Sequence, residues 1–371
     1  MSKKFNLDLA DLLASLGVLA VTFIIASVSI APGLVNNALI ETNAIKSGRY
    51  AVTFPGLDSI EKQDESSIIT IGNSILQAAT DGSCISDSLE LDNTMVYNLA
   101  ISGANPYTEI IQVPRLVEVN PKAVLLDLGP NSLWAFTNSS SMNEYIEFRF
   151  NILSISLDKN HLNDWIHLIR EEDLQYLPLN TTDKIDSTYS YSMISLENEL
   201  MKETHEIFGL NYYDRKMPDV GSDEWIGYLQ TPTFAPPKFQ LWNDTELENW
   251  FEENMPKRKH YGVFNPHSNG TLNHISLDYT IKTLTDAGID VFMVSTPHHP
   301  LTYGYLDPGQ IDGHNDTLQY FEEEYGAIPV NWFWETWEPD MFRDRNHLGD
   351  LGREYYCERI SDYLNNYYIE E

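Results

Sequence analysis

Basic residues are scarce in this chain. Its 371 residues include 23 Lys and Arg against 55 Asp and Glu, which gives a formal net charge of −32. Nucleic-acid binding needs a basic surface that neutralises phosphates, so this composition argues against a nucleic-acid partner. The same charge argues against binding of the main domain to anionic lipid headgroups. The acidity is either an adaptation to a saline exterior, where salt screens self-repulsion, or a surface property without environmental meaning.

Cysteine is also scarce, since the chain holds only Cys84 and Cys357. The two residues fit an exported domain with at most one disulfide bridge, and two free thiols are an equally good interpretation. Neither cysteine has the neighbouring ligands that a metal site would require. A glycine-rich phosphate loop, a dinucleotide-binding fingerprint and an internal repeat are missing from the sequence. No cofactor and no metal are therefore expected.

Charge is absent from a long segment near the amino terminus. Residues 12–30, nineteen in all, hold no charged side chain, and the run Leu16–Ala26 is strongly apolar. This is about the length that crosses a hydrocarbon core of ~30 Å. Because Lys3 and Lys4 precede the segment, the positive-inside rule places the amino end inside and the large domain outside. The sequence therefore predicts a single-pass anchor in the cell membrane over residues 1–31, with a cleaved signal peptide as the alternative.

A β-type run farther along the chain ends in a turn that carries a serine. The apolar residues Ile68–Ile71 precede Gly72, Asn73 and Ser74, and a more helical stretch, Ile75–Ala79, follows. The hydroxyl is therefore expected at the carboxyl end of a strand and the amino end of a helix. Unpaired N–H groups at such a helix end can stabilise a developing oxyanion. Ser74 is either a nucleophile or only the cap of the helix.

Two further blocks follow in chain order. The run Tyr97–Ala104 is typical of a strand and then a loop, in which the N–H of Gly103 can approach a substrate closely. The apolar run Ala123–Leu128 is typical of a buried strand that delivers Asn131 at its end. The amide of Asn131 can donate to an oxyanion, although a plain turn residue is the other interpretation.

The fourth block pairs a carboxylate with an imidazole before a C-terminal helix. Asp344 and His347 are three residues apart, and on a helical turn this spacing puts both side chains on one face. His347 can then take the proton of Ser74 while Asp344 fixes the tautomer and orientation of the imidazole. Asp344 lies in a charged stretch and could be merely solvated. Four blocks in the required order favour the catalytic interpretation.

These blocks resemble those of the SGNH (GDSL-like) hydrolase family. That family has a Ser, a Gly, an Asn and an Asp-x-x-His pair in this order, and the matching positions are Ser74, Gly103, Asn131, Asp344 and His347. The resemblance covers the chain from about residue 66 to residue 360, with a long unmatched middle. It implies an acyl-serine mechanism in which Ser74, Gly103 and Asn131 hold the oxyanion.

Two positions depart from the family pattern. Asn73 stands in place of the usual Asp before the nucleophile, and Ser132 rather than Asp follows Asn131. In both respects the chain looks like the membrane-anchored relatives, such as DltD-like and alginate-acetylation proteins. That branch implies acyl groups on cell-surface carbohydrate as the substrate and a membrane-bound O-acyltransferase as a partner.

The alternation of strands and helices predicts an α/β fold, a three-layer sandwich around a mainly parallel sheet of SGNH or flavodoxin-like type. Residues 32–65 are expected to form a juxtamembrane linker and residues 66–371 the catalytic domain. An aromatic-rich insertion at about 133–256 is expected to pack over or beside the mouth of the active site. One helix is predicted over Pro106–Asn120 and another over Leu277–Ala287.

A histidine-containing loop, Thr296–Pro300, follows a predicted buried strand at the edge where open α/β sheets bind ligands. Its residues His298 and His299 could contact substrate, and a structural role is the alternative. Five glycosylation sequons are compatible with an external domain and with a glycoprotein. They lie at Asn138, Asn180, Asn243, Asn269 and Asn315.

Together these features predict an outward-facing, membrane-anchored serine esterase or O-acyltransferase that acts on ester-linked acyl groups. The alternative, from another functional class, is a catalytically inactive surface protein that binds glycan or scaffolds an envelope complex. The distance between Ser74 and His347 distinguishes the two, because an inactive protein has no need to bring these residues together.

Overall fold

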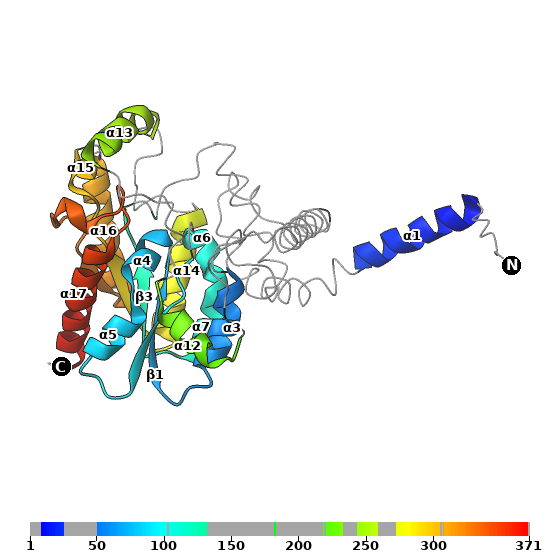
Figure 1. The fold of residues 1–371 in the computed structure, drawn as a ribbon. Helices are drawn as coiled ribbons and strands as arrows, with labels where there is room; N and C mark the ends of the chain where they lie inside the picture. The colour runs from blue at the N-terminus through cyan, green and yellow to red at the C-terminus, as the bar shows by residue number, and fades with distance from the viewer. Residues whose placement is uncertain are drawn as a thin grey trace, which may run out of the picture.

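The computed structural model describes residues 9–25, 50–101, 104–130, 132, 182, 218, 220–232, 243–258, 272–304, 306 and 308–369. Within them, five parallel strands form one sheet in the order β2-β1-β3-β4-β5. The strands lie in the middle of the domain, with helices on either side of them (Figure 1). The strands are β1 (Ser66–Ile71), β2 (Thr94–Asn98), β3 (Ala123–Asp127), β4 (Asp290–Ser295) and β5 (Ile328–Asn331). The strand order reverses between β1 and β3, which is where open α/β sheets bind their ligands.

Helices cover both faces of the sheet, because successive side chains of a strand point to opposite sides. Ile69 and Ile71 of β1 pack into one buried cluster, and Ile68 packs into the other. Helices of the first cluster are α3 (Tyr50–Ile60), α7 (Val113–Val119), α12 (Asp223–Gln230), α14 (Leu272–Asp286) and α16 (Pro308–Tyr325). Helices of the second are α4 (Ser74–Ala79), α5 (Gly82–Ser88) and α17 (Asp350–Ile369). The predicted α/β fold, a parallel sheet between helical layers, is confirmed.

The segment predicted to anchor the chain contains α1 (Leu9–Ile25), a helix of 17 residues. In the described part of the chain, no helix is both long and apolar enough to cross a membrane. The uncharged segment of the sequence reaches residue 30, and residues 26–49 lie outside the described part. The membrane anchor therefore stays a prediction.

The second half of the predicted linker is part of the folded domain. Residues 50–60 form α3, in which Val52 and Leu57 have no exposed surface and Ile60 is 3% exposed. These side chains belong to the same buried cluster as Ile69 and Ile71. α3, which lies within the predicted linker, therefore packs into the same hydrophobic core as the sheet.

The helix predicted over Pro106–Asn120 is interrupted. It consists of α6 (Pro106–Glu109), the 3-10 turn η2 (Ile110–Gln112) and α7. Pro114, near the start of α7, has no N–H to donate to the preceding turn, so a continuous α-helix is disfavoured there. The predicted end of the segment is correct, since Asn120 adopts a left-handed conformation with φ 50° and caps α7.

The last part of the predicted insertion contributes two described helices, α12 and α13 (Asp244–Arg258). Trp225 and Leu229 of α12 are fully buried in the first cluster, and the indole of Trp225 donates to the hydroxyl of Ser59 at 2.9 Å. α12 is thus a structural element of the domain. The sequence of the insertion also predicts helices at 143–157, 162–172 and 194–208, and these three segments lie outside the described residues.

Candidate active site

A tight turn after β1 delivers Ser74. Gly72 has φ +141°, and a Cβ at this position would lie 2.4 Å from the Cβ of Asp127, so only glycine fits. Asn73 caps α4, because its Oδ1 accepts the N–H of Ile75 at 2.7 Å. Ser74 is therefore the first residue of α4 and not its cap, which leaves the hydroxyl available for another partner.

The partner of the Ser74 hydroxyl is His347. The Oγ of Ser74 lies 2.9 Å from the Nε2 of His347, a contact between residues 273 positions apart in the chain. The Nδ1 of His347 lies 2.9 Å and 2.8 Å from the two carboxylate oxygens of Asp344. A carboxylate on Nδ1 keeps the imidazole proton there, so Nε2 can accept the serine proton. The structure thus joins the three predicted catalytic side chains in one hydrogen-bonded chain.

The Asp–His loop, residues 342–348, holds Asp344 and His347. Its ends form an antiparallel bridge between Phe342 and Leu348. The Oδ1 of Asp344 accepts the backbone N–H groups of Asn346 at 3.0 Å and His347 at 2.9 Å. A carboxylate that accepts hydrogen bonds from the backbone N–H groups two and three residues later in the chain forms a turn that is not helical. The helical turn predicted here is therefore wrong, although the pairing of Asp344 with His347 is present.

The same hydrogen bonds set the charge of Asp344, which is 7% exposed. Burial raises the pKa of this carboxyl, but hydrogen bonds from the imidazole and the two N–H groups, together with the charge of His347, outweigh burial and hold the pKa at about 2. Asp344 is therefore ionised at neutral pH. In that state it can stabilise the imidazolium that forms when His347 accepts a proton.

Of the two histidines predicted as substrate contacts, His299 supports the Asp–His loop through its backbone, whereas His298 bonds to a neighbouring tyrosine. His299 is 3% exposed, and its backbone N–H donates to the carbonyl of Arg345 at 2.9 Å. The hydroxyl of Thr302 donates to the same carbonyl at 3.0 Å. His298 is 5% exposed, and its backbone N–H donates to the Tyr303 oxygen at 3.0 Å. Contact of either imidazole with substrate stays a prediction.

The imidazole of His298 is uncharged at neutral pH. Burial lowers its pKa to about 3, and the neighbouring charges of Arg345 and His347 act in the same direction. Its ring packs edge-to-face on Phe333, with the ring centroids 4.7 Å apart. A neutral, buried imidazole of this kind is suited to packing or to a hydrogen bond, and not to an electrostatic role.

Helix α13, at the end of the predicted insertion, borders the Asp–His loop. The guanidinium of Arg345 stacks over the ring of Trp250, 4.0 Å from its centroid. Asp244, the first residue of α13, has a carboxylate oxygen 3.8 Å from the Nε2 of His299. This part of the insertion therefore lies beside the loop that carries the imidazole of His347.

The two other predicted oxyanion donors, Gly103 and Asn131, lie outside the described residues. The described neighbours of Asn131 are hydrogen-bonded to each other, because the N–H of Ser132 donates to the carbonyl of Gly129 at 3.0 Å. The roles of Gly103 and Asn131 stay predictions. Of the three donors proposed for the oxyanion, only Ser74 has a described position.

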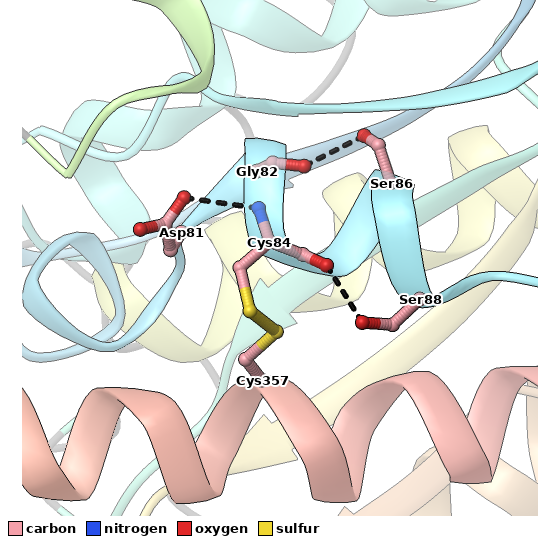
Figure 2. Close-up of a disulfide and its surroundings, with 6 residues drawn as sticks. All are labelled: Asp81, Gly82, Cys84, Ser86, Ser88 and Cys357. Atoms are coloured by element: carbon pink, nitrogen blue, oxygen red, sulfur yellow. Dashed lines mark hydrogen bonds between the residues drawn. A yellow bond between two sulfur atoms is a disulfide. The ribbon is translucent and has the colours of Figure 1, made fainter.

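A disulfide joins the helices that follow the two halves of the site. Cys84 of α5 is bonded to Cys357 of α17, with the Cα atoms 6.2 Å apart, and Asp81 caps α5 by accepting the N–H of Cys84 (Figure 2). Cys84 lies ten residues after Ser74 and Cys357 ten residues after His347, so the cysteines have the same sequence separation of 273 as these two predicted catalytic residues. The sequence left open whether the two cysteines are paired or free, and in the structure they form a disulfide.

A buried carboxylate that no sequence motif indicated lies beside the turn that carries Ser74. The Nδ2 of Asn73 donates to the Oδ2 of Asp127, which is 3% exposed at the end of β3. Burial raises the pKa of Asp127 to about 7, and hydrogen bonding from Asn73 offsets part of that rise. Glu109 is 2% exposed, and burial and the charge of Asp127 raise its pKa. The signal in the sequence was a single Asp inside an apolar strand.

Comparison with known proteins adds no family assignment. A scan against protein-family models gave no match for this chain, and a search of curated proteins gave none either. The resemblance to SGNH hydrolases therefore depends on the residues of the four blocks. The functional argument depends on the geometry of Ser74, His347 and Asp344.

Proposed function

We propose that the protein is a serine esterase or O-acyltransferase of SGNH type, carried on an N-terminal membrane anchor with its catalytic domain outside the cell membrane. The observation that supports it is the hydrogen-bonded chain from Ser74 through His347 to Asp344. An inactive surface protein would have no reason to bring together a serine and a histidine 273 residues apart. The strand order, which is that of flavodoxin-like sheets, agrees with this proposal.

In the first half of the reaction, the Oγ of Ser74 attacks the carbonyl carbon of an ester, and the Nε2 of His347 takes the hydroxyl proton. The tetrahedral intermediate carries an oxyanion near the amino end of α4, where the Ser74 N–H can donate to it. Gly103 and Asn131 are the other donors that the family resemblance implies. Collapse of the intermediate breaks the ester bond, and His347 returns its proton to the leaving alcohol. Between these two proton transfers, the carboxylate of Asp344 stabilises the imidazolium of His347.

In the second half, the acyl group leaves Ser74. His347 takes a proton from water or from an acceptor hydroxyl, and the resulting oxygen nucleophile attacks the acyl carbon. The proton then returns to the Oγ of Ser74. Water as the acceptor makes the protein an esterase, whereas a sugar hydroxyl makes it an O-acyltransferase. The resemblance to the anchored branch implies acylated surface carbohydrate as the substrate and a membrane-bound O-acyltransferase as the source of acyl groups.

The decisive test is covalent labelling of the purified full chain with a fluorophosphonate probe, followed by peptide mapping. The label should lie on Ser74, and both Ser74→Ala and His347→Ala should abolish it, together with turnover of short-chain aryl esters. Ser88, an exposed serine of α5, supplies the matched control, because Ser88→Ala should be labelled like the parent. Equal labelling of the parent and Ser74→Ala would show that the proposal is wrong.

A further inference from the structure

The turn that carries Ser74 rests on a carboxylate that the proposed reaction does not use. Asp127 closes β3 and packs directly against Gly72, whose missing Cβ would come within 2.4 Å of the Cβ of Asp127. The Oδ2 of Asp127 also accepts a hydrogen bond from the Nδ2 of Asn73. Asp127 therefore touches both residues that immediately precede Ser74.

The Asn73 side chain links this carboxylate to the first turn of α4. Its Nδ2 donates to Asp127, and its Oδ1 accepts the N–H of Ile75 at 2.7 Å. The carboxyl group of Asp127 offers an acceptor oxygen whether it is protonated or ionised, and the Asn73 amide presents its NH₂ group to that oxygen. The amide is planar, and its oxygen then faces Ile75. Ser74 lies in the chain between Asn73 and Ile75, and the hydrogen bonds of the Asn73 side chain fix both of these neighbours.

We propose that Asp127 is a positioning residue for Ser74, acting through the amide of Asn73 to keep the hydroxyl within reach of His347. The inference rests on the proposed function, because it assigns a role in aiming the same nucleophile. An ionisable group is costly in a buried position, and here burial raises the pKa of Asp127 to about 7. Its register partner on β4, Val294, is apolar, so an apolar residue would suit the packing at this depth. Buried ionisable groups beside a reactive residue are typical of functional sites.

The first test removes the acceptor. Asp127→Ala should lower the rate of fluorophosphonate labelling of Ser74 roughly 10- to 100-fold, because a misplacement of about 1 Å can cost about 10²-fold. The KM for a short-chain aryl ester should change little while kcat falls, since Asp127 lies behind the nucleophile. Asp127→Asn keeps an acceptor for the Asn73 amide and should recover most of the rate.

Val294→Ala is the matched control, because it opens a buried cavity beside Asp127 without touching the Asn73 amide. It should lower the unfolding temperature and leave the labelling rate of the folded protein near that of the parent. The second test is a double-mutant cycle with Asn73→Ala. If Asp127 acts through Asn73, the doubly substituted protein should react no more slowly than the slower single variant. Multiplying losses, or an Asp127→Ala protein as fast as the parent, would overturn the proposal.

A different readout separates this inference from the proposed function. If the parent shows no labelling at Ser74, the proposed function is wrong. The positioning role is then decided by crystal structures of the parent and Asp127→Ala. A Ser74 Oγ to His347 Nε2 distance that grows beyond roughly 3.5 Å in the variant supports positioning, because no hydrogen bond spans it. An unchanged distance overturns it.

Discussion

Two buried aspartates near Ser74 have opposite electrostatic properties. Asp344 accepts hydrogen bonds from the imidazole of His347 and from two backbone N–H groups, and its pKa is about 2 despite burial. Asp127 accepts its hydrogen bond from the Asn73 amide, and burial raises its pKa to about 7. The number of donors that face each carboxylate accounts for the difference, because each donor stabilises the charged form that burial disfavours.

Asp344 should stabilise the fold at neutral pH and lose that effect in acid. Its folded pKa lies below the ~3.9 of an unfolded Asp, so the stabilisation is present above pH ~4 and is lost as pH falls through about 2. Asp344→Asn should therefore lower the unfolding free energy by roughly 2–3 kcal/mol at pH 7 and by almost nothing near pH ~2. Urea unfolding across this pH range measures the difference. Asp340→Asn, at an exposed position, is the control. If Asp344→Asn lowered the unfolding free energy by the same amount at all pH values, the prediction would be contradicted.

Asp127 should show the reverse dependence. Its folded pKa of about 7 lies above the unfolded value, so its contribution is complete below pH ~4 and is lost as pH rises through 7. Asp127→Asn, which keeps an acceptor for Asn73, should match the parent near pH ~4 and exceed its unfolding free energy by up to ~4 kcal/mol at pH ~8. Chemical denaturation at the two pH values checks this. An Asn variant that is less stable at high pH would count against a buried carboxylate at this position.

Some residues of the candidate site could be predicted from the sequence, and others could not. Ser74 follows a recognisable strand and precedes a helix, and Asp344 and His347 form a short local motif, so all three could be predicted. The contact between Asn73 and Asp127 could not, because it joins residues 54 positions apart. It depends on the parallel register of β1 with β3, in which Ile71 faces Leu126. No local pattern in the sequence specifies that register.

At the scale of helices and strands, tertiary packing overrides local signals. The sequence predicts a linker over residues 32–65, where Pro55 and Gly56 disfavour a helix, yet both residues lie inside α3. A Cβ on Gly56 would lie 3.1 Å from methyl groups of both Leu99 and Leu229, so this glycine lets α3 pack closely on its neighbours. Burial against other elements thus compensates for weak helix propensity. The strands were easier to predict, because continuous apolar runs are typical of a parallel sheet that is covered on both faces.

The disulfide between α5 and α17 should stabilise the domain without being needed for chemistry. Replacement of both Cys84 and Cys357 by Ser should lower the unfolding free energy by about 2–5 kcal/mol, since the bridge closes a very long loop. The labelling rate of Ser74 in the folded variant should stay within a few-fold of the parent's. Other contacts position α17, including the hydrogen bond from the Nε of Arg353 to the carbonyl of Ala78 at 3.0 Å.

Thermal unfolding with and without a dithiol reductant measures the effect of the disulfide. Reduced parent and untreated double-Ser protein should unfold at similar temperatures, and the reductant should leave the double-Ser protein unchanged. A folded double-Ser protein with no reactive Ser74 would instead show that the disulfide is needed to align the two halves of the site.

At the scale of the whole molecule, net charge should make stability depend on salt. The net charge is −32, and the excess acidic side chains repel one another most strongly in the folded state, where they are closest together. Raising NaCl from about 0.01 M to about 1 M shortens the Debye length from about 30 Å to about 3 Å, which screens this repulsion. The urea midpoint should therefore rise with salt. A neutral solute at equal osmolality is the control, and an equal gain from that solute would exclude charge screening as the cause.

The membrane anchor is the last property of the whole molecule that can be tested directly. α1 leaves large apolar side chains exposed, among them Leu13, Leu16 and Leu19, which are 53–65% exposed, and a lipid environment would cover them. In cells that express the full chain, carbonate washing should leave the protein in the membrane fraction. Protease added to intact cells should degrade the domain, because Lys3 and Lys4 keep the amino end inside.

A Lys3→Glu/Lys4→Glu variant removes the positive flank and should reduce the protease-accessible fraction, with the unaltered chain as its control. Release of the parent by carbonate, with a new amino terminus near Ala31, would instead demonstrate a cleaved signal peptide. A parent chain that keeps its amino terminus, resists protease in intact cells and is released by carbonate would contradict both interpretations. The external location of the proposed esterase would then be wrong, whereas the reactivity of Ser74 would be judged separately by the probe.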